Sequence, residues 1–134
     1  MNNLFFVIVL LGLVFLLTHF FAVIFYMYWF YWWSQILVHF LGGLWVGLVF
    51  LWLIFFVFSI PLNFNRQTNF VIFLLTSIFF TFIIAVVWEI FEFQIGFTSY
   101  SQDYFFDTVS DLLVGVSGGM LASIWAYRVY CSQK

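Results

Sequence analysis

Residues 70–93 read FVIFLLTSIFFTFIIAVVWEIFEF, and no charged side chain interrupts the run before Glu89 and Glu92 near its end. A helix of 24 residues is about 36 Å long, whereas the hydrocarbon core of a bilayer is about 30 Å thick. The stretch therefore predicts a transmembrane helix that carries two carboxylates close to one membrane surface.

Three further apolar stretches predict helices at about residues 4–27, 35–58 and 107–130. The segment around residues 26–33 (YMYWFYWW) is almost entirely aromatic, which suits a membrane interface. The first stretch lacks a basic start and no A-x-A site follows, so we expect a retained helix rather than a cleaved signal peptide. The predicted fold is all-α: a polytopic membrane protein that forms a four-helix transmembrane bundle, with one domain over residues 1–134.

The composition excludes several classes of protein. Apolar residues make up 67% of the 134 residues and charged residues only 6%, against about 25% charged in soluble domains. So few charges cannot cover a soluble globule, which excludes a soluble enzyme, a disordered linker and a basic nucleic-acid-binding protein. The single cysteine, Cys131, excludes an internal disulfide. We expect the lipid bilayer, and no nucleic acid, as a partner.

The few basic residues predict the orientation. With four spans, both termini and the 59–69 loop lie on one side, where Arg66, Arg128 and Lys134 all fall. The positive-inside rule makes this side cytoplasmic. We therefore expect an N-in/C-in, multi-pass protein of the plasma (inner) membrane, with the 94–106 loop on the extracytoplasmic side.

The acidic residues gather at the predicted outer end of the bundle, since all five lie between positions 89 and 111. Glu89 and Glu92 share one helix face at i, i+3 spacing, and Asp107 and Asp111 share another at i, i+4. His39 lies about one turn into the second helix from the same surface. These five side chains predict a polar pocket that opens toward the outer leaflet, and His19 is a further candidate.

Small residues indicate which helix faces meet. Gly43 and Gly47 continue the face of His39, and a second stripe runs down the last helix from Asp111: Gly115, Gly118, Gly119, Ala122 and Ala126. Small residues at this spacing let helix backbones approach closely in lipid. If the two faces pack together, His39 and Asp111 point into the same cavity.

The predicted pocket has acids but no built-in cation. A charged side chain in hydrocarbon costs at least about 2.5–3.5 kcal/mol on insertion scales, so such acids normally face protein or water and have a task. Protons, a divalent metal ion or a cationic group of a ligand must neutralise them. Carboxylates together with histidine suit Zn, Mn or Fe, and carboxylates with water suit Mg or Ca. The candidate metal ligands are His39, Glu89, Glu92, Asp107 and Asp111.

Each of these residues also has a structural interpretation. Asp107 suits an N-cap, and Asp111 suits the positive end of a helix. Glu92 is close enough to the predicted surface to reach the headgroup region. His39 and His19 suit neutral histidines that are hydrogen-bonded to a carbonyl group.

The motifs HFLGG (39–43), WEIFEF (88–93) and DTVSDLL (107–113), followed by Gly118, resemble those of the YjdF-like small membrane proteins. They are more distantly similar to VanZ-like proteins, some of which are linked to glycopeptide (teicoplanin) resistance. The resemblance covers roughly residues 38–122 and implies polar positions at His39, Glu89, Glu92, Asp107 and Asp111, but no established reaction. Glu92 stands where VanZ-like proteins usually have Gln, and an Arg before the Asp pair is absent. YjdF-like proteins are often longer, which implies that this chain is a minimal core or a homo-oligomer.

Three functions follow as hypotheses. The first is a metal-dependent or acid–base hydrolase or transferase acting on a lipid-linked envelope substrate, with Glu89 and Asp111 as ligands or general base and His39 as ligand or proton shuttle. The second is a non-catalytic membrane module whose acids receive a basic group of a partner. The third is a proton-coupled permease, which the apolar inner half of the bundle disfavours.

Overall fold

The computed structural model describes residues 2–96 and 104–132. It contains α1 (Asn2–Ile24), α2 (Met27–Phe30), α3 (Trp32–Trp52), the π-helical segment η1 (Leu53–Val57), α4 (Arg66–Ile95) and α5 (Tyr104–Ser132). Four stretches of helix are long and apolar enough to cross a membrane: Leu4–Ile24, Trp32–Val57, Arg66–Ile95 and Phe105–Ser132. The prediction of an all-α bundle with four transmembrane helices is confirmed.

The first two spans meet at a sharper turn than the predicted ranges 4–27 and 35–58 suggest. α1 ends at Ile24 because Tyr26 takes a left-handed backbone conformation with φ 55°. The chain then makes the single-turn helix α2, and α3 begins at Trp32. The hydroxyl of Ser34 donates to the carbonyl groups of Met27 and Tyr31, at 3.1 and 2.7 Å, and thereby ties this turn to α3.

The third and fourth spans are longer than predicted. α4 begins at Arg66 rather than at residue 70, because the Asn65 side chain accepts a hydrogen bond from the backbone N–H of Thr68 at 2.8 Å and caps the helix. It ends at Ile95, where Gly96 has φ 68°, a left-handed conformation that glycine adopts without strain. α5 begins at Tyr104 rather than at residue 107, so Asp107 lies inside the first turn of α5 and is not its N-cap.

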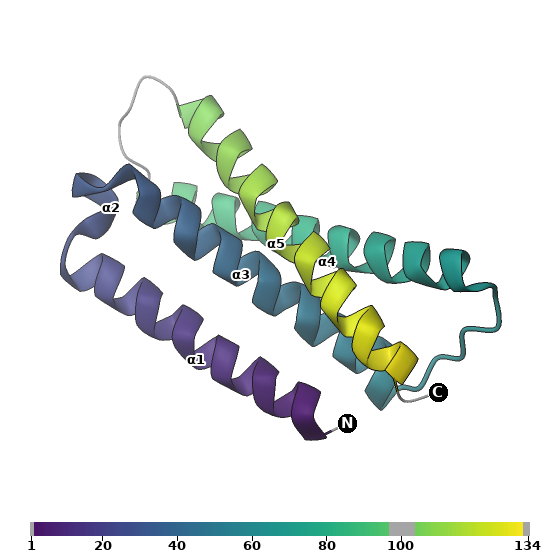
Figure 1. The fold of residues 1–134 in the computed structure, drawn as a ribbon. Coiled ribbons are helices and arrows are strands. Elements are labelled where there is room, and N and C mark those ends of the chain that lie inside the picture. Colours follow the sequence, from purple (N-terminus) through teal and green to yellow (C-terminus); the bar gives the residue numbers. More distant parts are fainter. Residues whose placement is uncertain (1, 97–103, 133–134) are drawn as a thin grey trace.

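The helices run alternately up and down, so that the bundle has two different ends (Figure 1). The start of α1, the end of α5 and the connection between η1 and α4 lie together at one end, while α2, the end of α4 and the start of α5 lie at the other. α3 is the central helix and packs against α1, α4 and α5. α1 packs mainly on α3, and its contact with α4 is slight.

The predicted packing of the two small-residue faces is confirmed. A Cβ atom added to Gly43 would collide with the carbonyl oxygen of Gly115, and one added to Gly118 would collide with the carbonyl oxygen of Phe40. The backbones of α3 and α5 are therefore in direct contact. The hydroxyl of Ser77 in α4 donates to the carbonyl oxygen of Gly119 at 2.6 Å and joins the third helix to this contact.

The end of the bundle that carries the termini is filled by apolar side chains. Phe55 and Phe73 stack with their ring centroids 4.2 Å apart, and Tyr127 packs edge-on against Phe73. Leu48, Leu51, Ala122 and Ala126 are buried around them. The Tyr127 hydroxyl donates to the backbone carbonyl of Arg66 at 2.7 Å, where α4 begins. The core of this half of the bundle is mainly apolar, and the buried acids lie in the other half.

Candidate functional site

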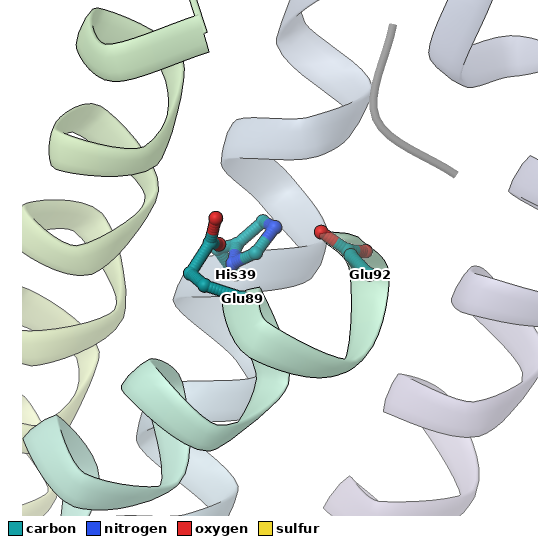
Figure 2. Close-up of side chains that lie close together, drawn as sticks. All are labelled: His39, Glu89 and Glu92. Atoms are coloured by element: carbon teal, nitrogen blue, oxygen red, sulfur yellow. The ribbon is translucent and has the colours of Figure 1, made fainter. Parts of the chain in front are cut away.

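Three side chains from two helices form a compact group at the end of the bundle opposite the termini. His39 of α3 and Glu89 and Glu92 of α4 each offer one ligand atom, and these atoms all lie within 4.8 Å of one another. Figure 2 shows the imidazole of His39 between the two carboxylates. The two glutamates reach the same histidine because their i, i+3 spacing places them on one face of α4.

Asp111 of α5 is a third acid in contact with His39. Its Oδ2 atom lies 3.4 Å from Nε2 of His39, and the two side chains are only 6% and 10% exposed. The pair lies one turn along from the point where Gly43 of α3 meets Gly115 of α5. The close backbone contact at the glycines therefore sets the distance between the imidazole and the carboxylate.

Glu89 is the more deeply buried of the two glutamates, with 7% of its surface exposed. Its Oε1 atom is buried and has no hydrogen-bond partner among the described residues, and the same holds for Oγ1 of Thr108 in α5. Thr108 lies close enough to interact with the carboxylate. Both residues line a shallow pocket of about 350 Å³ between α4 and α5 whose other walls are apolar. Leaving a buried polar group unpaired costs about 1–3 kcal/mol.

His19 and Tyr28 form a second polar pair beside the group. Nδ1 of His19 lies 2.7 Å from the Tyr28 hydroxyl, and the Trp88 ring meets the His19 ring edge-on with centroids 5.6 Å apart. The pKa of Tyr28 is raised, first by burial and then by the negative charges of Glu92 and Asp111. His19 therefore lies near the site but outside the group of three.

Tyr28 is a site residue that the sequence interpretation missed. It lies inside the aromatic run at residues 26–33, which we assigned to the membrane interface as a whole. No spacing rule distinguishes it from the tyrosines at positions 26 and 31. Its position depends on the left-handed residue Tyr26, which turns the chain so that α2 packs against α1 and α3.

The structure divides the five predicted ligands into three kinds. His39, Glu89 and Glu92 come together as a group, and Asp111 touches that group through His39. Asp107 lies outside the group, although its charge acts on Glu89, Glu92 and Asp111.

Acidic side chains outnumber basic side chains at the site. Within residues 2–96 and 104–132 the only Lys or Arg side chains are those of Arg66, at the start of α4, and Arg128, near the end of α5. Both are at the opposite end of the bundle. Three carboxylates therefore surround one imidazole without a nearby side-chain cation in the described part of the chain, and the arrangement favours binding of a cation.

Comparison with known proteins gives a family but no activity. The family model described as "Predicted membrane protein (DUF2238)" matches residues 3–132, which include all four spans and every residue of the site. No curated protein and no solved structure matches the chain.

Proposed function

The chain belongs to the DUF2238 family of predicted membrane proteins, and on this premise we propose that it is a metal-dependent membrane enzyme whose ion is held by His39, Glu89 and Glu92. The observation that supports this proposal best is the group of three ligand atoms, all within 4.8 Å of one another, in the membrane-embedded part of the chain. Glu89 is buried and His39 and Glu92 are half-buried, and carboxylates at such positions are stabilised by a cation.

The spacing of the group suits a metal ion after small side-chain rotations. Two ligands that are each about 2.1 Å from a tetrahedral ion lie about 3.4 Å apart. The widest pair in the group, at up to 4.8 Å, has to close by about 1.4 Å, which side-chain rotation alone supplies for a glutamate. Three protein ligands leave a coordination position free, as in catalytic rather than structural zinc sites.

The surroundings of the group also fit a divalent ion. The unpartnered Oε1 atom of Glu89 is a buried acceptor that a cation would satisfy. The two glutamates supply two negative charges, which a divalent ion balances. Asp111, at 3.4 Å from Nε2 of His39, is placed to orient the imidazole, as carboxylates beside metal-bound histidines commonly are. The mixture of nitrogen and oxygen ligands suits Zn, Mn or Fe better than Mg or Ca.

The reaction that we propose is hydrolysis or group transfer on a lipid-linked envelope substrate. A divalent ion at this position would activate a water molecule and polarise a phosphoryl or carbonyl oxygen. Tyr28 and Asp107 lie close enough to act on the charges of the group, and both are candidates to position the substrate or to move a proton. The apolar core around Phe73 and Leu48 lies between the group and the other end of the bundle, which supports an enzyme over a permease.

The side of the membrane is part of the proposal. Arg66 and Arg128 lie at the end of the bundle opposite the acids, so the positive-inside rule supports a group that faces the extracytoplasmic side of the plasma membrane. The resemblance of the motifs at residues 39–43, 88–93 and 107–113 to YjdF-like and VanZ-like proteins is consistent with a task in the cell envelope.

Elemental analysis of the protein, purified in mild detergent without chelator, tests the metal. We expect about one transition-metal ion per chain, and we expect Glu89→Gln and His39→Ala to lose it. Asp107→Asn is the matched control, because this acid is close to the group but outside it, and it should keep the ion. Gel filtration and far-UV circular dichroism check that each variant remains folded.

Two results would contradict the proposal. A wild-type protein that binds no metal, even after incubation with Zn, Mn or Fe and dialysis, would exclude the site and favour a module that receives a cationic group of a partner. A metal content that depends on Asp107 as strongly as on Glu89 would mean that the ligand set is wrong.

A further inference from the structure

An apolar cavity of about 210 Å³ lies directly beside His39. Its walls are mainly aromatic and aliphatic side chains from α1, α3 and α4, among them Phe15, Trp45, Val46, Ile84, Ala85 and Trp88. His39 belongs to this cavity as well as to the group of three ligand atoms. The candidate metal site and the cavity are therefore adjacent and share His39.

The polar atoms near the cavity are few. The indole N–H of Trp45 donates to the carbonyl oxygen of Ile8 in α1 at 3.1 Å, so this donor is not available to a ligand in the cavity. Apart from His39 and the two indoles, Thr81 is the one lining residue with a polar side chain. A polar ligand would lose its hydrogen bonds on entering such a space, whereas an apolar ligand would lose none.

The contacts around the cavity indicate an opening on the side where α1 and α4 face each other. α1 packs mainly on α3 and has only slight contact with α4, and the ring contact of His19 with Trp88 bridges these two helices near the acids. Ile84 of α4 lines the cavity and is also 39% exposed on the outer surface of the bundle. An opening beside Ile84 faces the hydrocarbon of the bilayer, because this residue is in the middle of a span.

We propose that this cavity holds part of an aliphatic chain of an amphiphilic substrate whose polar head lies at His39, Glu89 and Glu92. A cavity of about 150 Å³ with apolar walls takes up benzene, so a volume of about 210 Å³ suits an aliphatic segment somewhat longer than six carbons. In this proposal the aliphatic chain of the substrate enters between α1 and α4 from the bilayer. The polar head of the substrate then meets His39, Glu89 and Glu92 from the membrane side. The chemical nature of the substrate's polar head rests on the proposed function, whereas the site for its aliphatic chain does not.

Binding of short amphiphiles to the full chain in detergent tests the inference. Octyl phosphate carries a chain and a head that a metal ion binds, and methyl phosphate carries the same head without the chain. Ala85→Phe fills the cavity from α4, and Val46→Phe fills it from α3. Val87→Phe is the matched control, since Val87 is 57% exposed on the outside of the same helix. All variants are first checked for helical content and a monodisperse gel-filtration profile.

In metal-loaded protein we expect each filling variant to weaken binding of octyl phosphate at least tenfold, measured by calorimetry, while binding of methyl phosphate and the metal content stay unchanged. Val87→Phe should bind both compounds as the wild type does. Two folded filling variants that bind octyl phosphate with wild-type affinity would overturn the inference. Equal wild-type affinities for octyl and methyl phosphate would overturn it as well.

A second arm separates this inference from the proposed metal site. Octylammonium and methylammonium are titrated into metal-free protein, in which the acids themselves attract the head. A preference for octylammonium that Ala85→Phe or Val46→Phe abolishes supports the chain site even if the protein binds no metal. A metal-binding protein without any chain preference in either arm would retain the proposed function and exclude the chain site.

Discussion

Gly43→Ala is expected to destabilise the bundle and to disturb the candidate site at the same time. The added methyl group would point into the backbone of α5, where it would lie 2.6 Å from the carbonyl carbon and 2.9 Å from the Cα atom of Gly115. Backbone atoms cannot rotate away as the end of a flexible side chain can. The two helices therefore have to separate.

The size of the effect follows from these distances. Ordinary van der Waals contact begins at 3.4 Å, so relief of the carbonyl carbon alone requires α3 and α5 to move apart by about 0.8 Å, and relief of the carbonyl oxygen of Gly115, which lies nearer, requires more. A gap of 0.5–1 Å forfeits a quarter to a half of the dispersion energy of each contact, and overpacking typically costs about 1–3 kcal/mol. The higher helix propensity of alanine, about 1 kcal/mol in water, offsets part of this cost. We expect a net loss of about 1–2 kcal/mol.

The reciprocal change provides the control. A Cβ atom on Gly115 would lie 3.7 Å from the carbonyl oxygen of His39 and 3.9 Å from Cβ of Ala85, which are ordinary contacts. Gly115→Ala should therefore be neutral or slightly stabilising, although it alters the same interface by the same methyl group. Unfolding by SDS in mixed micelles, followed by tryptophan fluorescence, gives the free energy of unfolding of both variants.

The same pair of variants reports on the site. Because Asp111 and His39 lie one turn from this contact and 3.4 Å apart, a separation of the helices weakens their interaction, and Gly43→Ala should lower the affinity for metal. A stable Gly43→Ala variant together with a destabilised Gly115→Ala variant would refute the proposed contact between α3 and α5. Loss of stability without any change in metal affinity would refute the link from the glycines to the site.

Two further predictions concern the outer parts of the bundle. Tyr28→Phe removes the 2.7 Å hydrogen bond to His19 and should lower the free energy of unfolding by about 0.5–1.5 kcal/mol in the same assay. An unchanged free energy of unfolding would mean that this hydrogen bond contributes nothing to stability. Burial and the charges of Glu92 and Asp111 raise the pKa of Tyr28 above its ordinary value of 10.0, so the phenol ionises more readily in the unfolded protein than in the folded one. The wild type should therefore lose more stability than Tyr28→Phe as the pH rises above 10. Trp45→Phe removes the donor to Ile8 and leaves a gap against Gly12, so α1 should become more accessible to proteolysis while α3, α4 and α5 stay protected. Equal cleavage rates in α1 would contradict this.

The four spans and the packing of the small residues were predictable because each rests on a local property of the sequence. The length of an apolar run decides whether it crosses the bilayer, and no tertiary contact changes that. The stripes that begin at Gly43 and Gly115 reflect a steric rule, since only residues without a large side chain allow two backbones to touch. The gathering of the acids at one end followed from connectivity, because α4 must end where α5 begins.

Which of the acids contacts His39 was not predictable from their spacing in the sequence. Asp107 and Asp111 share a face of α5, and the sequence treats them alike. The contact of Gly43 with Gly115 lies one turn from Asp111 and two turns from Asp107, and crossing helices diverge with distance from their closest approach. Asp111 therefore reaches His39, whereas Asp107 lies where α5 has moved away from α3 (Figure 1). The crossing angle, which sequence spacing does not contain, decides this.

The turn that places Tyr28 depends on backbone conformation in the same way. Residues 24–32 contain no glycine, proline or asparagine, so the sequence carries no turn signal there. Tyr26 nevertheless has φ 55°, a conformation that a non-glycine residue adopts only when its surroundings stabilise it. Packing of the aromatic rings, such as that of Tyr26 on Trp29 with centroids 5.6 Å apart, supplies part of that stabilisation.

Protons and a metal ion are the two simplest ways to neutralise the buried acids, and Glu89 distinguishes between them. A protonated carboxyl group is a hydrogen-bond donor and needs an acceptor within reach. The buried Oε1 atom of Glu89 has no partner among the described residues, and the nearby Oγ1 atom of Thr108 is likewise unpaired. A proton on Oε1 would have the hydroxyl oxygen of Thr108 as its acceptor. A divalent ion instead uses Oε1 as a ligand and balances the charges of both glutamates, and Asp111 then keeps its own charge against the N–H of His39. The carboxamide of Glu89→Gln, which has a donor but no charge, separates the two cases. It should mimic a proton at Oε1 and retain the fold, and under the proposed function it should also lose the ion.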